Sequence, residues 1–169
     1  AAAAVGLLLG ETPELIAQGL VSYQASGMRQ NIYEQDGYQI YADCYNASPD
    51  AMEATLSVLG GMAGDGRRFA VLGSMLELGD YAEEGHRRAG RAAAQYADAL
   101  YAYGPDAAAM VAGAREKGME HAYAFDDQTA LVAALREDAK KGDTLLFKGS
   151  RGMRMERALA MFLGEEVEA

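Results

Sequence analysis

The chain has 169 residues, with 25 acidic and 15 basic side chains, and so carries a formal net charge of −10. Half of the residues are apolar, and the mean hydropathy is −0.14. This balance is typical of one soluble globular domain that can bury a core, and it excludes collagen-like, coiled-coil and wholly disordered chains. The negative charge argues against a general nucleic-acid binder or a binder of anionic membranes, because both need a basic face.

The N-terminus and the cysteine content indicate in which cellular compartment the protein works. The chain opens with Ala1–Ala4 in place of an initiator Met, so we expect it to be cut from a longer chain. The apolar run over residues 1–9 is too short to span a bilayer and lacks the basic flank of a signal peptide. Cys44 is the single cysteine, which leaves no internal disulfide, and with only two histidines a structural metal site is not expected. These features favour a cytoplasmic protein with an inert thiol beside Asp43.

The N-terminal segment is expected to form two helices and a linker. Residues 1–9 form the end of a helix that Gly10 stops. Thr12 is expected to cap a second helix, in which Pro13 occupies the first turn. Helical periodicity ends in residues 22–27, where small polar residues gather, and this indicates a linker.

A hairpin and a helix follow the linker. Residues 31–35 and 38–42 are separated by an Asp-Gly pair, which favours a type I′ turn because both of its central positions need a positive φ. A helix is expected to begin at Pro49, after a polar loop that starts at Asp43.

The rest of the chain alternates short apolar strands with helices. Strands are expected at residues 68–73, 98–103, 122–125 and 144–148, and helices at 82–97, 106–117, 128–140 and 154–163. Such alternation predicts βαβ units and a mostly parallel sheet with helices on both faces. With right-handed crossovers, the predicted fold class is α/β, a Rossmann-like doubly wound sheet with an N-terminal β-hairpin.

Three loops follow predicted strands and carry polar chemistry, at residues 43–50, 73–79 and 148–154. In an open α/β sheet, ligands bind beyond the carboxyl ends of the strands, so these loops are the candidate site. The chain contains no G-x-x-x-x-G-K-[ST] phosphate loop.

The loop at residues 148–154 is the strongest candidate for an anion site. It places three basic side chains, Lys148, Arg151 and Arg154, around a glycine turn that leads into a helix N-terminus. Backbone N–H groups and cations together attract an anion. The alternative is a glycine turn whose basic residues are merely solvated.

The loop at residues 43–50 offers groups for a nucleoside. Asp43 can accept ribose hydroxyls, and Tyr45 can stack or donate a hydrogen bond. The alternative needs no ligand, because Asn46 forms turns and Ser48 caps helices. His86 follows the second loop on a predicted helix, where a lone histidine is more often packed than catalytic.

Three motifs occur together along the chain. They read DCYNASPDAM at residues 43–52, VLGSMLELG at 71–79 and FKGSRGMRME at 147–156, with His86 between the last two. In this order they resemble the Mur ligases of peptidoglycan synthesis, and within that family the ligases that join D-alanyl-D-alanine to UDP-N-acetylmuramoyl-tripeptide. The Gly-Met-Arg sequence at 27–29 is similar to the family's junction between the central and C-terminal domains.

The resemblance implies an ATP-dependent amide ligase of three domains that works through an acyl phosphate. Residues 1–26 would be a remnant of the central ATPase domain with its linker, and residues 27–169 would be the C-terminal domain. ATP with Mg²⁺ is the implied cofactor, its magnesium ligands lying mainly in the central domain. D-alanyl-D-alanine is the substrate expected here, while UDP-N-acetylmuramoyl-tripeptide is held by the other domains. A monomer that is inactive as a fragment is expected.

The resemblance also implies roles for residues near the nucleotide. Arg29 is expected to reach the phosphates of ATP when the domains close. Asp43 is expected on the ribose, with Tyr45 and Asn46 also on the adenosine side. Pro49 is expected to shape their loop.

On the substrate side, Lys148, Ser150 and Arg151 are expected to hold the carboxylate of D-alanyl-D-alanine. His86 matches a recurrent histidine of the family, to which no chemical step is assigned. Ser74 stands where the family often has Asp, so a role for that carboxylate does not carry over to this chain.

Two alternatives stay open from the sequence. The first is the C-terminal domain of a sister ligase of the MurE or folylpolyglutamate synthase type, which would prefer diaminopimelate or glutamate. The second is a free-standing nucleotide-binding module without ligase activity.

Overall fold

The computed structural model describes residues 2–22, 29–62 and 64–165. Its helices are α1 (Ala2–Leu8), α2 (Pro13–Val21), α3 (Pro49–Gly61), α4 (Ala82–Tyr96), α5 (Ala107–Glu116), α6 (Gln128–Asp138) and α7 (Met155–Leu163). Its strands are β1 (Asn31–Gln35), β2 (Tyr38–Asp43), β3 (Arg68–Gly73), β4 (Ala99–Tyr103), β5 (Ala122–Phe125) and β6 (Thr144–Lys148). Short 3₁₀ turns at Gly79–Tyr81 and Arg151–Met153 precede α4 and α7.

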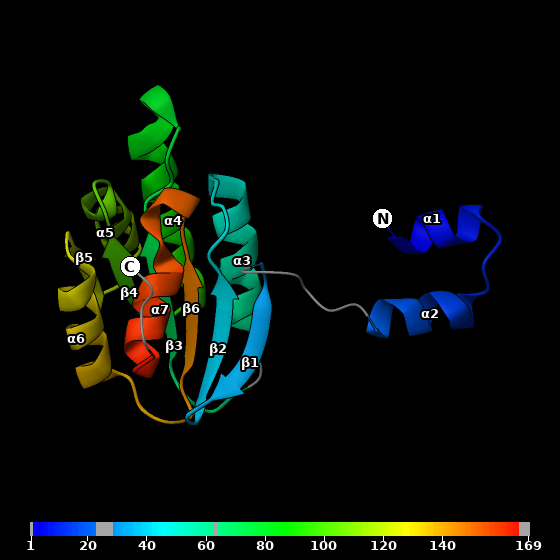
Figure 1. The fold of residues 1–169 in the computed structure, drawn as a ribbon. Helices are drawn as coiled ribbons and strands as arrows, with labels where there is room; N and C mark the ends of the chain where they lie inside the picture. The colour runs from blue at the N-terminus through cyan, green and yellow to red at the C-terminus, as the bar shows by residue number, and fades with distance from the viewer. Residues whose placement is uncertain (1, 23–28, 63, 166–169) are drawn as a thin grey trace.

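The strands form one six-stranded sheet in the order β1-β2-β6-β3-β4-β5 (Figure 1). β1 runs antiparallel to β2, and the other neighbouring strands are parallel. The predicted α/β class, a mostly parallel sheet with helices on both faces and an N-terminal hairpin, is confirmed. β6 comes last in the sequence but lies between β2 and β3, so the winding of the chain changes direction at this point.

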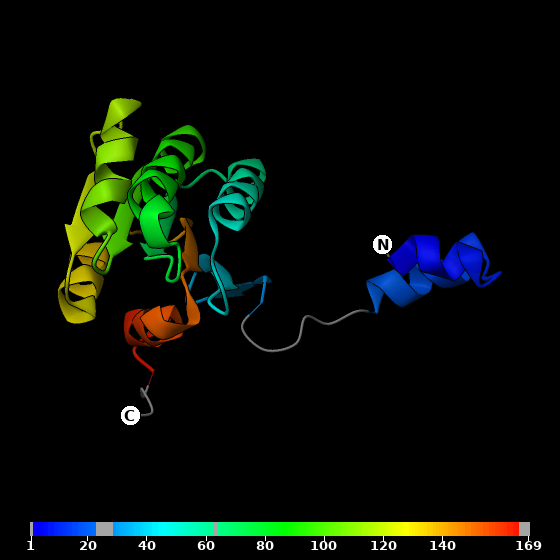
Figure 2. The ribbon, with the colours of Figure 1, turned by 90° about the horizontal axis from the view of Figure 1, so that it is seen from above.

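Different helices cover the two faces of the sheet (Figure 2). α3, α4 and α5 pack on one face, and α6 and α7 pack on the other. Along β3, Ala70 and Leu72 belong to the first core, whereas Phe69 and Val71 belong to the second, because successive side chains of a strand point to opposite faces. Both faces of this central strand are therefore buried, which explains its continuous apolar sequence.

α1 and α2 pack on each other and lie away from the sheet in both views (Figures 1 and 2). The predicted stop and cap are confirmed, since Gly10 has a φ of +83° and Thr12 Oγ1 accepts the Leu15 N–H at 3.3 Å. The predicted linker at residues 22–27 falls almost entirely outside the described residues. No helix in the described parts of the chain is long and apolar enough to cross a membrane.

The hairpin has the predicted turn. Asp36 and Gly37 have φ values of +54° and +82°, as a type I′ turn requires. β2 extends one residue beyond its predicted end, to Asp43, because that residue still pairs with Lys148 of β6. The strand therefore carries Asp43 directly into the site described below.

Several predicted element ends are wrong by one or two residues. β4 starts one residue later than predicted, since the Asp98 carboxylate accepts the Arg68 N–H at 2.7 Å outside the strand. α6 ends two residues early, and the N–H of Lys140 binds the Asp143 carboxylate at 2.7 Å. α7 starts after Arg154, whose φ of +46° is not helical. α4 is one residue shorter at its end, and α5 is one residue shorter at both ends.

Candidate functional site

The carboxyl ends of β2, β6 and β3 lie next to one another in the sheet. In the register of the parallel ladders, Lys148 at the end of β6 is opposite Asp43 of β2 on one side and Leu72 of β3 on the other. This is the point where the strand order changes direction, which is where open α/β sheets bind their ligands. The fold thus brings together the three loops singled out from the sequence.

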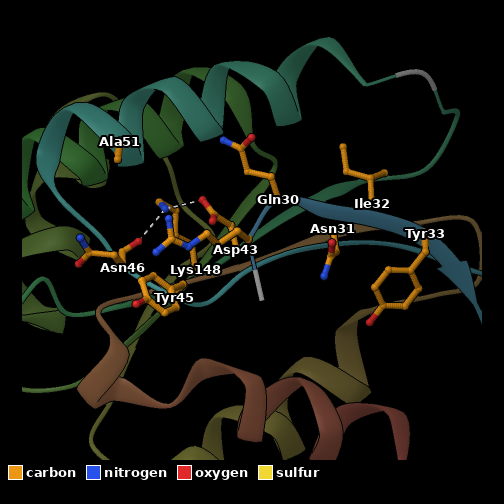
Figure 3. Close-up of a pocket in the computed structure, with 10 residues that line it drawn as sticks. Gln30, Asn31, Ile32, Tyr33, Asp43, Tyr45, Asn46, Ala51 and Lys148 are labelled. Carbon is orange, nitrogen blue, oxygen red and sulfur yellow. Dashed lines mark hydrogen bonds and ion pairs between the residues drawn. The ribbon is translucent and has the colours of Figure 1, made fainter. Parts of the chain in front are cut away.

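Asp43 and Lys148 form a buried ion pair (Figure 3). The Lys148 side chain is 2% exposed, and its Nζ donates to Asp43 Oδ2 at 2.5 Å and to the Asn46 carbonyl oxygen at 2.9 Å. Thr55 on α3 donates its hydroxyl to the same Asp43 oxygen at 3.3 Å. A lysine at this depth is stable only because its charge is paired and hydrogen-bonded.

An open cleft of about 870 Å³ lies over this pair. It is lined by Arg29, Gln30, Asn31, Ile32, Tyr33, Asp43, Tyr45, Asn46, Ala51 and Lys148. The Arg29 guanidinium lies 3.8 Å from the centroid of the half-exposed Tyr45 ring. This arrangement can bind a nucleoside phosphate. The guanidinium can pair with the phosphate, the tyrosine ring can stack on the base, and the carboxylate can accept the ribose hydroxyls.

The loop between Asp43 and α3 has the capping contacts that the sequence offered as an alternative. Ser48 Oγ accepts the Ala51 N–H at 3.4 Å, and Asn46 Oδ1 accepts the Ala47 N–H at 2.9 Å. Pro49 is buried in the first turn of α3. These contacts fix the loop, and they leave the amide nitrogen of Asn46 for a ligand.

His86 is fully buried and holds the loop after β3. Its Nε2 accepts the Met75 N–H at 2.8 Å, so the ring proton is on Nδ1, which donates to the Ala82 carbonyl oxygen at 2.6 Å. Asp106 Oδ2 lies 3.7 Å from Nε2. Because Nε2 is occupied as an acceptor, the ring is neutral and this proximity is not an ion pair. The structure therefore gives His86 the role of a loop support.

Ser74 and Ser150 tie the loops of three strands together. Ser150 Oγ accepts the Leu76 N–H at 2.9 Å, and Ser74 Oγ accepts the Asp106 N–H at 3.1 Å. The loop after β4, residues 104–106, thus joins the same edge, although the sequence pattern left it without a predicted role. A Gly-Pro pair directly after a predicted strand is the signal that could have marked it.

Two of the three basic side chains expected to converge on one anion, Lys148 and Arg151, have different carboxylate partners. Lys148 pairs with Asp43, because the strand register places that carboxylate beside it. Arg151 is exposed and binds Glu156 at 2.8 Å. Arg154 adopts the left-handed conformation, and its carbonyl accepts a hydrogen bond from Gln128 at 3.2 Å. Lys148 is therefore held in a buried pair with Asp43, and an anion site formed by Arg151 and Arg154 at this turn stays a prediction.

Cys44 is expected to be unreactive in the folded protein. It is fully buried and donates to the Phe147 carbonyl oxygen at 3.4 Å. Burial, with the charges of Glu156 and Asp43, raises the pKa of the Cys44 thiol to about 12. We expect no reaction with Ellman's reagent at pH 8 until the chain is unfolded in guanidinium, followed by one thiol per chain. A stoichiometric reaction of the native protein within minutes would contradict this burial.

Within residues 2–22, 29–62 and 64–165, no three His, Cys, Asp or Glu side chains are grouped to hold a metal ion.

Comparison with known proteins identifies the family. The family model described as Mur ligase, glutamate ligase domain, matches residues 28–151. The chain belongs to the Mur ligase family. Relatives named UDP-N-acetylmuramoyl-tripeptide–D-alanyl-D-alanine ligase include that of Bacillus subtilis, 37% identical over 92% of this chain and 35% of the relative. That of Escherichia coli is 34% identical over 94% of this chain and 34% of the relative.

Solved structures agree with this membership. The MurF ligase from Thermotoga maritima in complex with ADP superposes with a TM-score of 0.80 at 33% identity, covering 96% of this chain and 36% of that one. The Mur ligase chain described here spans about a third of the length of these relatives.

Proposed function

We propose that this chain is the C-terminal domain of an ATP-dependent ligase that joins D-alanyl-D-alanine to UDP-N-acetylmuramoyl-tripeptide in peptidoglycan synthesis. The observation that carries the proposal is the cleft over the Asp43–Lys148 pair, at the change of strand order, in a chain whose relatives bear that name. The proposed reaction forms an acyl phosphate on the tripeptide, which the amine of the dipeptide then attacks. Its setting is the cytoplasm, and the working unit is a monomer.

The proposed domain division is residues 1–26 for the end of the central ATPase domain and 27–169 for the C-terminal domain. The match to the Mur ligase, glutamate ligase domain begins at residue 28, whereas the relative from Synechocystis matches 98% of this chain. The N-terminal helices therefore lie within the stretch of this chain that matches that relative, and before the start of the domain match. Leu8 and Val21 are 85% and 87% exposed, as expected for helices that another part of a longer protein covers.

The cleft residues fit a nucleotide in their chemistry. Asp43 faces the cleft as a hydroxyl acceptor for the ribose, with Tyr45 and Asn46 beside the adenosine. Arg29 supplies the positive charge for the phosphates. The related MurF structure from Thermotoga maritima holds ADP. ATP would supply the phosphoryl group that activates the tripeptide, and its Mg²⁺ would be held mainly by residues of the central domain.

The dipeptide carboxylate is proposed to bind at the 148–154 loop. Arg151 and Arg154 are exposed cations of this loop, and the turn leads into α7, whose N-terminal N–H groups favour an anion. Ser150 supports the loop through Leu76. Lys148 was expected here from the resemblance, but its contacts lie on the nucleotide side.

A chimera tests the proposed function. This chain would replace the C-terminal third of the Bacillus subtilis relative, and ADP release would be measured with UDP-N-acetylmuramoyl-tripeptide, ATP and D-alanyl-D-alanine. We expect turnover by the chimera and none by this chain alone, since each ligand site is only partly built here. In isolation the chain should bind ATP and the dipeptide only weakly by calorimetry.

The other outcomes separate the alternatives. A folded chimera that uses glutamate or diaminopimelate in preference to the dipeptide would favour a sister ligase. A folded chimera without any turnover, combined with tight ATP binding by the chain alone, would favour a nucleotide-binding module. Turnover by the chain alone would contradict the proposed domain division.

A further inference from the structure

The two oxygens of Asp43 have different surroundings. Oδ2 accepts hydrogen bonds from both Lys148 and Thr55. Oδ1 accepts none from the described residues, and the Asp43 side chain is 10% exposed where it lines the cleft. One oxygen is thus anchored inside the protein, and the other is left to face a ligand.

The Lys148 amine binds groups of the segment at residues 43–46. Two of its three N–H groups go to Asp43 Oδ2 and to the Asn46 carbonyl, both on the segment from β2 to α3. The amine is buried. If the Lys148 side chain turned toward an anion at residues 150–154, the Asp43 carboxylate would lose its cation. Such an unpaired buried charge is strongly unfavourable.

We propose that Lys148 and Thr55 are positioning residues, which hold Asp43 Oδ2 and the Asn46 backbone so that Asp43 Oδ1 and the Asn46 amide meet the nucleotide. Lys148 therefore does not bind the carboxylate of the amino substrate. This inference rests on the proposed function, because it assigns the cleft to ATP. It moves Lys148 from the dipeptide site implied by the resemblance to the nucleotide site.

The Michaelis constants of the chimera separate the two roles. In Lys148→Met, we expect the KM for ATP to rise about tenfold or more, the loss typical of one hydrogen bond between charged groups, while the KM for D-alanyl-D-alanine stays within twofold. Thr55→Val, which keeps the side-chain shape, should give a smaller rise in the KM for ATP alone. Lys117→Met is the control, since Lys117 is exposed at the end of α5, at the opposite edge of the sheet.

A rise confined to the dipeptide KM, or no change in either KM, would overturn the proposal. Thr55→Val decides the matter if Lys148→Met does not fold, because a neutral hydroxyl is lost without leaving a charge unpaired. Activity of the unmodified chimera is established first, so a failure of the proposed function is seen before any variant is compared.

A second measurement needs no activity. In the chain itself, the buried Lys148 ammonium should give a slowly exchanging ¹H–¹⁵N signal, which disappears in Asp43→Asn and stays in Arg151→Gln. A Lys148 signal that responds to Arg151→Gln and ignores Asp43→Asn would contradict the assigned pairing.

Discussion

Replacing Lys148 with methionine is expected to lower the free energy of unfolding by about 3–5 kcal/mol at neutral pH. The variant leaves the Asp43 carboxylate buried with only the Thr55 hydroxyl as a described side-chain partner. Urea denaturation followed by near-ultraviolet circular dichroism measures the effect. Nine of the ten tyrosines lie between residues 33 and 123, so the signal reports on the domain with the sheet.

The double variant Asp43→Asn/Lys148→Met is the matched comparison. It removes both charges, so most of the lost stability should return, because no buried charge is left unpaired. Lys117→Met should stay within about 0.5 kcal/mol of the unmodified chain, as expected for an exposed position. If Lys148→Met were as stable as the control, the pair would not be buried as the structure shows.

Local features of the fold were predictable because their signals are contained in short segments. The Asp-Gly pair fixed the hairpin turn, and Thr12 and Ser48 marked two helix starts through their own side chains. The apolar strand at residues 68–73 was recognisable because both of its faces are buried. Each of these features depends on neighbours within a few residues, which a single sequence displays.

The strand order was not predictable in the same way. Alternating strands and helices indicate parallel pairing, but they do not say that β6 is inserted between β2 and β3. Lys148 and Asp43 are 105 positions apart in the sequence and adjacent in the sheet. The sequence alone groups Lys148 with its chain neighbours Ser150 and Arg151, whereas the strand register pairs it with Asp43.

The roles of the polar residues that support the loops were also not predictable from the sequence. His86, Ser74 and Ser150 have side chains that catalysis often uses, yet each accepts a backbone N–H from a loop at the same edge. Loop N–H groups that are buried need an acceptor, and their sequence neighbours do not reveal which side chain supplies it. Distinguishing support from chemistry at these positions requires the structure.

Replacing Gly90 with alanine is the other substitution expected to have a large effect. A Cβ atom at Gly90 of α4 would lie 1.8 Å from the Met110 carbonyl oxygen of α5, and one at Gly113 would lie 2.0 Å from the Arg87 carbonyl oxygen. The two helix backbones touch, so no side-chain rotation relieves the overlap. We expect Gly90→Ala to cost about 3 kcal/mol in unfolding free energy, at the upper end of the range for overpacking. The same urea titration measures it.

Gly61→Ala on α3 is the matched control, because a Cβ there meets nothing within 4 Å. Helix propensity alone should leave that variant equally stable or up to about 1 kcal/mol more stable. Gly90→Ala should also disturb the loop after β3, because His86 lies one turn earlier on α4 and Asp106 directly precedes α5. Separating the helices would move both supports of the loop after β3, so faster amide hydrogen exchange at Met75 should accompany the lost stability. Unchanged exchange and stability in Gly90→Ala would show that the helices do not cross as closely as the structure indicates.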